Sequence, residues 1–185
     1  MKVTQTPLNG CFIIEPKLLK DNRGSFLLNY NKEEFDNKTG LKVNFILENE
    51  SVSQYGVLRG LHLQVGQYSQ AKLVRVITGR ILDVVVDVRL GSNTFGESFS
   101  IELSEKENKQ LFIPRGFLHG FAVLENNTRV NYKCDNYYNV NSESGVIYND
   151  TQLNINWKLK KEEIILSEKD QKLKSFIEFS EIIKN

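Results

Sequence analysis

Only two histidines occur among the 185 residues, and both lie in apolar segments that contain glycine. His62 belongs to GVLRGLHLQ (56–64) and His119 to IPRGFLHGF (113–121). Imidazole is the side chain whose ordinary pKa lies closest to neutral pH, so it is the usual group for proton transfer. A lone histidine on an apolar strand is more often a hydrogen-bonded core residue. Polar neighbours on otherwise apolar strands shift the interpretation toward a functional site.

Such neighbours are present in the strands around both histidines. Because side chains alternate between the two faces of a strand, His62 is predicted on the face of Gly60 and Gln64, opposite Arg59. Three more polar side chains are predicted on faces that are otherwise apolar: Lys72, His119 and Tyr132. Burying these groups is costly unless they line a solvated pocket or bond one another. The pattern therefore predicts a ligand cavity.

Short strand patterns dominate the middle of the chain and set the predicted fold. Segments 72–77 and 81–88 flank a Thr-Gly-Arg turn, and the second alternates apolar even positions with Asp83 and Asp87. Further strands are predicted at 11–15, 25–31, 45–53, 56–64, 97–103, 110–113, 119–124 and 129–134. Many short strands without alternating helices predict an all-β protein, an antiparallel barrel or jelly roll.

Helix is predicted in only two places. Segment 32–37 could form a turn or two, and Ser167-Glu168-Lys169-Asp170 has the form of a capping box that starts a C-terminal helix. Apolar residues follow it at helical spacing: Leu173, Phe176, Ile177 and Ile182. No repeat or linker interrupts the chain, so residues 1–185 are predicted to form a single domain with a short C-terminal helical segment.

Composition excludes several classes of function. With 40% apolar residues, 25% charged residues and a net charge of +1, the chain gives no reason to expect a nucleic acid or a membrane surface as partner. No secretory signal and no apolar run of about 20 residues is visible, which favours a cytoplasmic location. Cys11 and Cys134 are too few for a disulfide framework or a zinc site.

A metal site is the obvious alternative for the second histidine segment. Segment 114–119 has the PxGxxH form of the second half of the cupin metal motif. The first half expects H-x-H, but Gln64 stands two residues after His62. With two histidines and no carboxylates that can be placed beside them, the sequence favours a site without metal. A metal-dependent cupin oxygenase remains the alternative.

Several segments, taken in order, carry a family resemblance. They are DNRG (21–24), GVLRGLHLQ (56–64), QAKLVRV (70–76), LDVVVDVR (82–89), GSNTFG (91–96), IPRGFLHGF (113–121), the tyrosines within 132–138 and LSEKD (166–170). Over most of its length the chain resembles the dTDP-4-dehydrorhamnose 3,5-epimerase family, of cupin jelly-roll fold. The resemblance implies epimerisation, without metal or cofactor, of a nucleotide-linked 4-keto-6-deoxyhexose carried by dTDP, in a cytoplasmic homodimer.

The resemblance also implies catalytic roles. His62 matches the general base that removes the protons on C3 and C5, which the C4 carbonyl acidifies because the carbanion is delocalised as an enolate. Asp170 matches the carboxylate that orients this imidazole. Lys72 matches the cation beside the enolate oxygen, and Tyr132 the acid on the opposite face of the ring. Without the resemblance, Asp170 is equally well a helix cap and Lys72 a charge at a strand end.

Further positions match the family's substrate-binding residues. Arg23 and Arg59 match the arginines that meet the diphosphate, a role that suits the planar guanidinium, and Tyr138 matches the aromatic side chain near the base. The other matched positions are Phe26, Asn49, His119, Glu143 and Lys169. In the family's dimer an N-terminal strand pairs with the partner's sheet, which brings the Arg23 region toward the neighbouring site.

Four positions depart from the family's usual residues: Leu28, Leu47, Glu50 and Tyr148. At these positions, in the same order, the family commonly has glutamate, glutamine, histidine and tryptophan. All four are expected around the sugar and the base. They therefore concern the substrate more than the reaction type. The alternatives left open are an epimerase acting at C3 or C5 alone, a 3,4-ketoisomerase acting on a related 4-keto sugar, and a non-catalytic sugar-nucleotide sensor.

Overall fold

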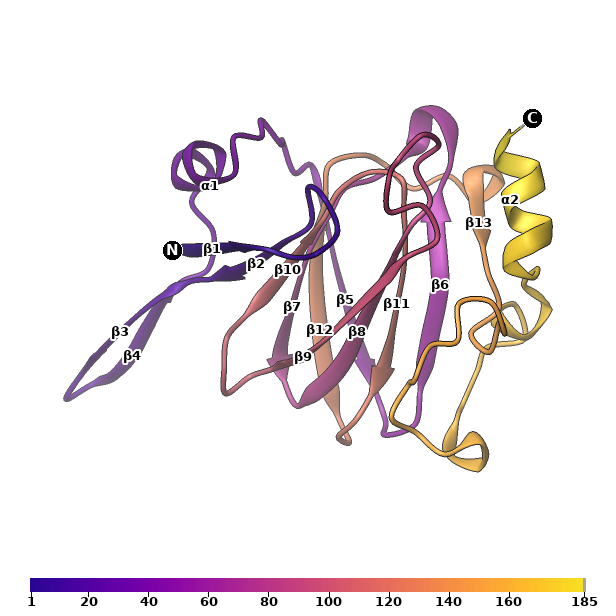
Figure 1. Ribbon diagram of the computed structural model, residues 1–185. Coiled ribbons are helices and arrows are strands. Elements are labelled where there is room, and N and C mark those ends of the chain that lie inside the picture. Colours follow the sequence, from indigo (N-terminus) through magenta and orange to yellow (C-terminus); the bar gives the residue numbers. More distant parts are fainter. Residues whose placement is uncertain (185) are drawn as a thin grey trace.

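The computed structural model describes residues 1–184, which form two antiparallel sheets packed face to face (Figure 1). The larger sheet has the order β1 (Lys2–Gln5), β2 (Phe12–Glu15), β10 (Gln110–Ile113), β7 (Lys72–Thr78), β12 (Thr128–Cys134), β5 (Leu47–Ser53). The smaller has the order β13 (Glu143–Gly145), β6 (Leu58–Gln64), β11 (Phe117–Val123), β8 (Arg80–Asp87), β9 (Ser98–Ser104). The predicted all-β jelly roll is confirmed.

Alternation along β8 divides the apolar interior into two parts. Ile81 and Val85 face the larger sheet and form part of the core between the sheets. Val84 and Val86 point the other way, toward Phe176 and the rest of the C-terminal segment, which covers the back of the smaller sheet. The predicted faces of this strand are therefore confirmed, and its acidic residues lie on the inner face.

The predicted strands agree with the observed ones to within a few residues, but three observed strands were not predicted. They are β1, β3 (Lys17–Asp21) and β13. Every side chain of β3 is exposed, so this strand has no buried face to produce an alternating pattern. β1 and β13 are short and lie at the edges of their sheets, where backbone pairing alone defines them.

β3 pairs with β4 (Gly24–Leu28) to form a hairpin that projects from the sandwich (Figure 1). We call this hairpin, residues 17–28, the arm. At its tip the carboxylate of Asp21 accepts hydrogen bonds from the backbone N–H of Arg23 at 2.9 Å and from its guanidinium at 2.7 Å. The arm exposes large apolar side chains: Leu18, Leu19, Phe26 and Leu28.

Helix α1 (Lys32–Thr39) extends the predicted 32–37 segment by two residues. Asn31 caps its first turn by accepting from the backbone N–H of Glu34 at 2.9 Å. Gly40 ends it in the left-handed conformation, with φ +72°, which glycine adopts without a steric penalty. The buried ring of Phe35 packs against Phe112 on the outer face of the larger sheet.

The helix predicted to start at Ser167 starts nine residues later, as α2 (Phe176–Lys184). Ser167 does accept from the backbone N–H of Asp170, at 3.1 Å, but only the 3₁₀ turn η4 (Asp170–Lys172) follows. The reciprocal capping contacts belong instead to Ser175 and Glu178.

Of the apolar residues noted at helical spacing, two do not lie on the buried side of the helix. Ile177 and Ile182 are exposed, whereas Phe176 and Phe179 are buried. Phe176, Phe179 and Ser180 recur at intervals of three and four residues and form the stripe that meets the smaller sheet, and Ile177 and Ile182 lie off this stripe. No helix within residues 1–184 is long and apolar enough to span a membrane.

Candidate active site

Two adjoining hollows between the sheets share His62, Lys72 and Tyr132 in their walls. Each has a volume of about 510 Å³. We call the one that also contains Arg59 and His119 the first lobe. The second lobe is the one that also contains Asn49, Gln64, Tyr138 and Glu143. The predicted ligand cavity is therefore present, with three of the four expected catalytic residues where the lobes meet.

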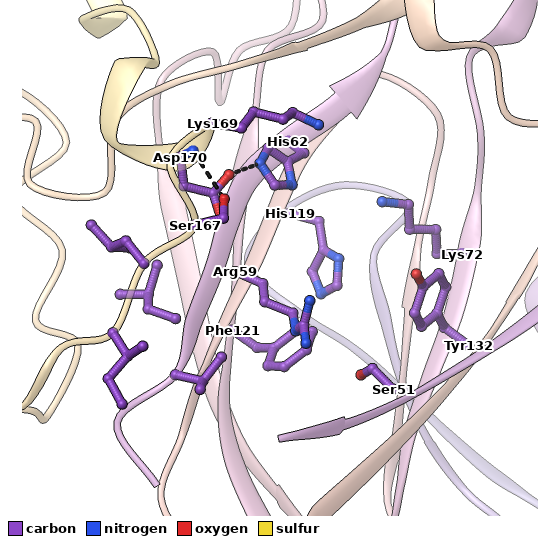
Figure 2. Close-up of a pocket in the computed structure, with 14 residues that line it drawn as sticks. Ser51, Arg59, His62, Lys72, His119, Phe121, Tyr132, Ser167, Lys169 and Asp170 are labelled. Atoms are coloured by element: carbon purple, nitrogen blue, oxygen red, sulfur yellow. Dashed lines mark hydrogen bonds and ion pairs between the residues drawn. The ribbon is translucent and has the colours of Figure 1, made fainter. Parts of the chain in front are cut away.

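The fourth expected catalytic residue, Asp170, binds His62 from a segment 108 residues further along the chain (Figure 2). The His62 Nε2 atom lies 2.5 Å from Asp170 Oδ1, and the Asp170 side chain is only 5% exposed. Burial tends to raise the pKa of Asp170, but the hydrogen bond and the charge interaction with His62 outweigh it and lower that pKa below its usual value. An ionised carboxylate in this position orients the imidazole and stabilises its protonated form.

A β-bulge in β6 places Arg59 on the same face as His62. His62 is paired with His119 in β11, and Arg59 with Phe121, so three steps along β6 match two along β11. Gly60 lies in the bulge at φ +113°, and a Cβ there would come within 2.6 Å of the Cα of Gly120. The predicted placement of Arg59 opposite His62 is wrong, because strict alternation does not survive the extra residue.

Lys72 and Tyr132 approach from the larger sheet, across the first lobe from His62 (Figure 2). Both lie on the inner face of adjacent strands, β7 and β12. Burial lowers the pKa of Lys72, and nearby Cys134, Asp83 and Glu143 act against this shift. Burial raises the pKa of Tyr132, so its phenol stays protonated at neutral pH and can donate a proton.

His119 forms a second histidine–carboxylate pair, with Asp83 of β8. The His119 Nε2 atom lies 2.6 Å from Asp83 Oδ1, and the two side chains are 7% and 0% exposed. Burial lowers the pKa of His119, and the neighbouring carboxylate only partly offsets this. The predicted pocket position of His119 agrees with its place in the first lobe.

A polar cluster includes residues from the walls of the second lobe. The Tyr138 hydroxyl donates to Glu143 Oε2 at 2.6 Å, and Lys169 forms an ion pair with the same carboxylate. Burial would raise the pKa of Glu143, but the hydrogen bonds from Lys169 and Tyr138 lower it. Asn49 lies opposite Tyr132 in the register of β5 and β12. Asn49, Tyr138 and Glu143 line the second lobe, and Lys169 lines the first lobe and is joined to the second through Glu143.

Arg23 and Phe26 are not brought to this cavity by their own chain. Both lie in the arm, where the Arg23 side chain is 86% exposed and Phe26 is 64% exposed. Neither lines the first or the second lobe.

Of the four departures from the family pattern, Leu47 alone lines a lobe, the second. Glu50 lies on the outer face of β5, where it pairs with Arg129. The carbonyl of Tyr148 accepts from the indole N–H of Trp157 at 2.7 Å, behind the smaller sheet, and Leu28 lies in the arm. The expectation that all four surround the substrate is wrong for Glu50 and Tyr148. Strand alternation places Glu50 on the outer face of the larger sheet, and Tyr148 lies behind the smaller sheet, so neither reaches the cavity.

Two serines of the first lobe were missed by the sequence reasoning. Ser51 lies two residues after Asn49 on the same strand face, so alternation could have found it. Ser167 also lines this lobe, although its sequence context indicates only a helix cap. Within residues 1–184 no three His, Cys, Asp or Glu side chains are grouped so that they could hold a metal ion together.

Comparison with known proteins identifies close relatives. A family model described as dTDP-4-dehydrorhamnose 3,5-epimerase matches residues 5–178. The dTDP-4-dehydrorhamnose 3,5-epimerase of Shigella flexneri is 40% identical over 178 residues, which cover 96% of this chain and 97% of that protein. The crystal structure of the Elizabethkingia anophelis enzyme of that name has a TM-score of 0.93 and 49% identity, and covers 96% of this chain and 97% of its own.

A second solved structure was determined with a ligand. The dTDP-6-deoxy-D-glucose-3,5-epimerase of Legionella pneumophila, in complex with dTDP-4-keto-L-rhamnose, has a TM-score of 0.90 and 42% identity. The match covers 94% of this chain and 92% of that one.

Proposed function

Because this chain belongs to the dTDP-4-dehydrorhamnose 3,5-epimerase family, we propose that it inverts C3 and C5 of dTDP-4-dehydro-6-deoxy-D-glucose by proton transfer through an enolate. The product is dTDP-4-dehydro-L-rhamnose. The observation that carries the mechanism is the position of an imidazole and a phenol, His62 and Tyr132, on opposite sides of one lobe (Figure 2). A flat enolate between them has one group on each face.

His62 is the general base. Its Nε2 atom is engaged by Asp170, so Nδ1 is the atom left to take a proton from C5 or C3. Each proton is acidic because it lies next to the C4 carbonyl, which accepts the electron pair as an enolate. Asp170 stabilises the imidazolium that results, since a buried carboxylate beside it compensates the new positive charge.

Lys72 stabilises the enolate oxygen. Its ammonium is buried on the inner face of β7, and burial lowers its pKa, which means that the charge has lost hydration. An anionic oxygen that forms beside it restores a favourable interaction in a site where solvent screening is weak. The contribution of such a group is typically about 3 kcal/mol of transition-state stabilisation.

Tyr132 supplies the new proton. Burial raises the pKa of its phenol, so the group is protonated when the enolate forms. Delivery from the face opposite His62 inverts the carbon, whereas return of a proton from His62 restores the original configuration. The proposed stereochemical result therefore depends on the two groups acting from different sides.

The second lobe holds the base and its ribose. Asn49, Tyr138, Glu143 and Lys169 offer an amide, an aromatic ring and a pair of opposite charges around this lobe, which suits a base and its ribose. Arg59 is proposed to meet the diphosphate, because a planar guanidinium can bind two phosphate oxygens at once.

Deuterium exchange tests the function. In deuterated water with dTDP-4-keto-6-deoxyglucose, we expect NMR to show deuterium at both C3 and C5. Label at one carbon alone would indicate a single-centre epimerase, and a ketone at C3 would indicate a 3,4-ketoisomerase. Binding of the sugar nucleotide without deuterium exchange would indicate a sugar-nucleotide sensor. If neither binding nor exchange occurred, this compound would be rejected as the substrate.

We also propose that the chain is a single domain that works as a homodimer, with the arm of each subunit at the site of its partner. An isolated two-stranded hairpin is at best marginally stable in water, and this one exposes Leu19 and Phe26. Packing on a partner would bury them and carry Arg23 to a diphosphate. A cytoplasmic location is supported by Cys11 and Cys134, which are both free and buried, as suits a reducing compartment.

Mixed dimers test the exchange of arms. Arg23→Ala and His62→Ala should each lose most activity alone, but co-expressed subunits should recover about a quarter of the wild-type rate. Half of the dimers are then mixed, and each has one site with both residues intact. The control is Arg59→Ala with His62→Ala, which lie in the same lobe of one chain and should not complement. Recovery in the control, or none with Arg23→Ala, would contradict the proposal.

A further inference from the structure

Asp83 is a buried carboxylate that the proposed mechanism does not use. Its Oδ1 atom lies 2.6 Å from His119 Nε2, and the side chain has no exposed surface. Its Oδ2 atom is buried and has no hydrogen-bond partner within residues 1–184. An unpaired buried carboxylate oxygen is costly, so the residue requires an explanation beyond packing.

His119 connects Asp83 to the cavity. The imidazole lines the first lobe near His62, Arg59 and Lys72 (Figure 2), whereas Asp83 lines neither lobe. Because Nε2 is engaged by the carboxylate, the ring nitrogen that remains for a ligand is Nδ1.

The ring of His119 is neutral at neutral pH. Burial lowers its pKa, the carboxylate of Asp83 opposes this without reversing it, and Lys72 and His62 lower the pKa further. A neutral imidazole has one N–H, and a carboxylate can only accept a hydrogen bond. The proton therefore lies on Nε2, and Nδ1 has a free lone pair.

We propose that Asp83 is a positioning residue, which holds His119 in the tautomer whose Nδ1 accepts a hydrogen bond from a hydroxyl of the bound sugar. The inference rests on the proposed function, since it concerns the same sugar. The groups that share the lobe with His119 include strong donors, the ammonium of Lys72 and the guanidinium of Arg59. An acceptor at His119 Nδ1 can bind a hydroxyl and cannot bind a carbonyl, which leaves the C4 carbonyl to the donor Lys72.

The tautomer can be measured directly because the chain has only two histidines. In protein labelled with ¹⁵N-histidine, NMR should show four ring nitrogens, and the His62→Ala variant assigns the two of His119. We expect a protonated Nε2 and an unprotonated Nδ1. A proton on Nδ1 would overturn the proposal, whatever the activity of the enzyme.

Asp83→Asn should reverse the tautomer. An amide NH₂ in place of Oδ2 would be a buried donor without an acceptor, so the NH₂ should turn toward His119 and donate to Nε2. The proton of the imidazole then moves to Nδ1, as in other histidine–aspartate pairs after this substitution. An unchanged tautomer in a folded variant would show that Asp83 does not control it.

Asp87→Asn is the matched control. Asp87 is equally buried on the same face of β8 and accepts from Arg89, Ser92 and Thr94, yet it lines neither lobe. Replacing this carboxylate by an amide should lower the unfolding temperature of the protein and leave the ¹⁵N spectrum of His119 unchanged. If Asp83→Asn does not fold, the wild-type spectrum still decides the proposal, because it needs no substitution.

Substrate analogues that lack the C2 or the C3 hydroxyl test the contact itself, with deuterium exchange at C5 as the readout. In the wild type, losing the hydroxyl that binds His119 should lower kcat/KM about 5- to 10-fold. In Asp83→Asn the hydroxyl would have to turn and accept from the Nδ1–H, so the loss should be smaller. If each analogue lowered kcat/KM by the same factor in the wild type and in Asp83→Asn, the proposed contact would be overturned. No C5 exchange with the intact substrate would instead count against the proposed function and leave the tautomer result valid.

Discussion

Replacing His62 by alanine should lower kcat/KM for epimerisation by about 10³- to 10⁴-fold, and deuterium exchange at C3 and C5 should fall equally. Lys72 and Tyr132 would still bind and polarise the sugar, but no group on the face of His62 could take the proton. The loss should appear mainly in kcat, because a base acts in the transition state more than in binding. NMR in deuterated water measures exchange and inversion together.

The fold of this variant should remain intact, since the His62 side chain is partly exposed in the cavity and its loss leaves no apolar void. Thermal unfolding checks this. The double variant His62→Ala, Asp170→Asn should be no slower than His62→Ala, because the two residues act as one unit. Retained exchange in His62→Ala would refute the base assignment, and a further large loss in the double variant would show that Asp170 acts independently.

Replacing Tyr132 by phenylalanine should separate exchange from inversion. Inversion at C3 and C5 should fall about 10²- to 10³-fold, because no acid remains on the face opposite His62. Exchange should persist, since His62 can remove a proton and return a deuteron to the same face. The recovered substrate would then contain deuterium at both carbons with its configuration unchanged.

Tyr30→Phe is the matched control for this experiment. Tyr30 packs on Phe35 and Phe45 outside the larger sheet, and its hydroxyl has no hydrogen-bond partner within residues 1–184. Removing that hydroxyl should change neither rate. If Tyr132→Phe lost exchange together with inversion, Tyr132 would be needed for proton removal and could not be the acid alone.

Local periodicity predicted most of the inner faces correctly. Alternation placed Lys72, His119 and Tyr132 on faces that do line the cavity, because no extra residue interrupts the alternation beside them in their own strands. The same rule failed for Arg59, since the glycine-lined bulge in β6 adds one residue. A bulge depends on what stands opposite, here Gly120, and no pattern within β6 reveals that neighbour.

The start of helix α2 depends on a long-range contact that the local sequence does not reveal. Ser167 and Asp170 have the spacing of a helix cap, and the capping hydrogen bond does form. The Asp170 side chain, however, forms a hydrogen bond with His62, in another part of the chain. This long-range contact leaves only a 3₁₀ turn at that position, and the helix starts where Ser175 and Glu178 cap each other.

The amino-acid sequence by itself determined the all-β architecture, because strand alternation is a local property, and it supplied the family resemblance from which the chemical roles were inferred. Only the tertiary structure decided which partners each proposed catalytic residue has. In the folded chain His62 is hydrogen-bonded to Asp170, 108 residues away in the sequence. Arg59 points into the cavity, whereas Arg23 lies on the arm outside it. The physical reason is that pairing, burial and pKa depend on neighbours in space, and chain folding, not sequence distance, selects those neighbours.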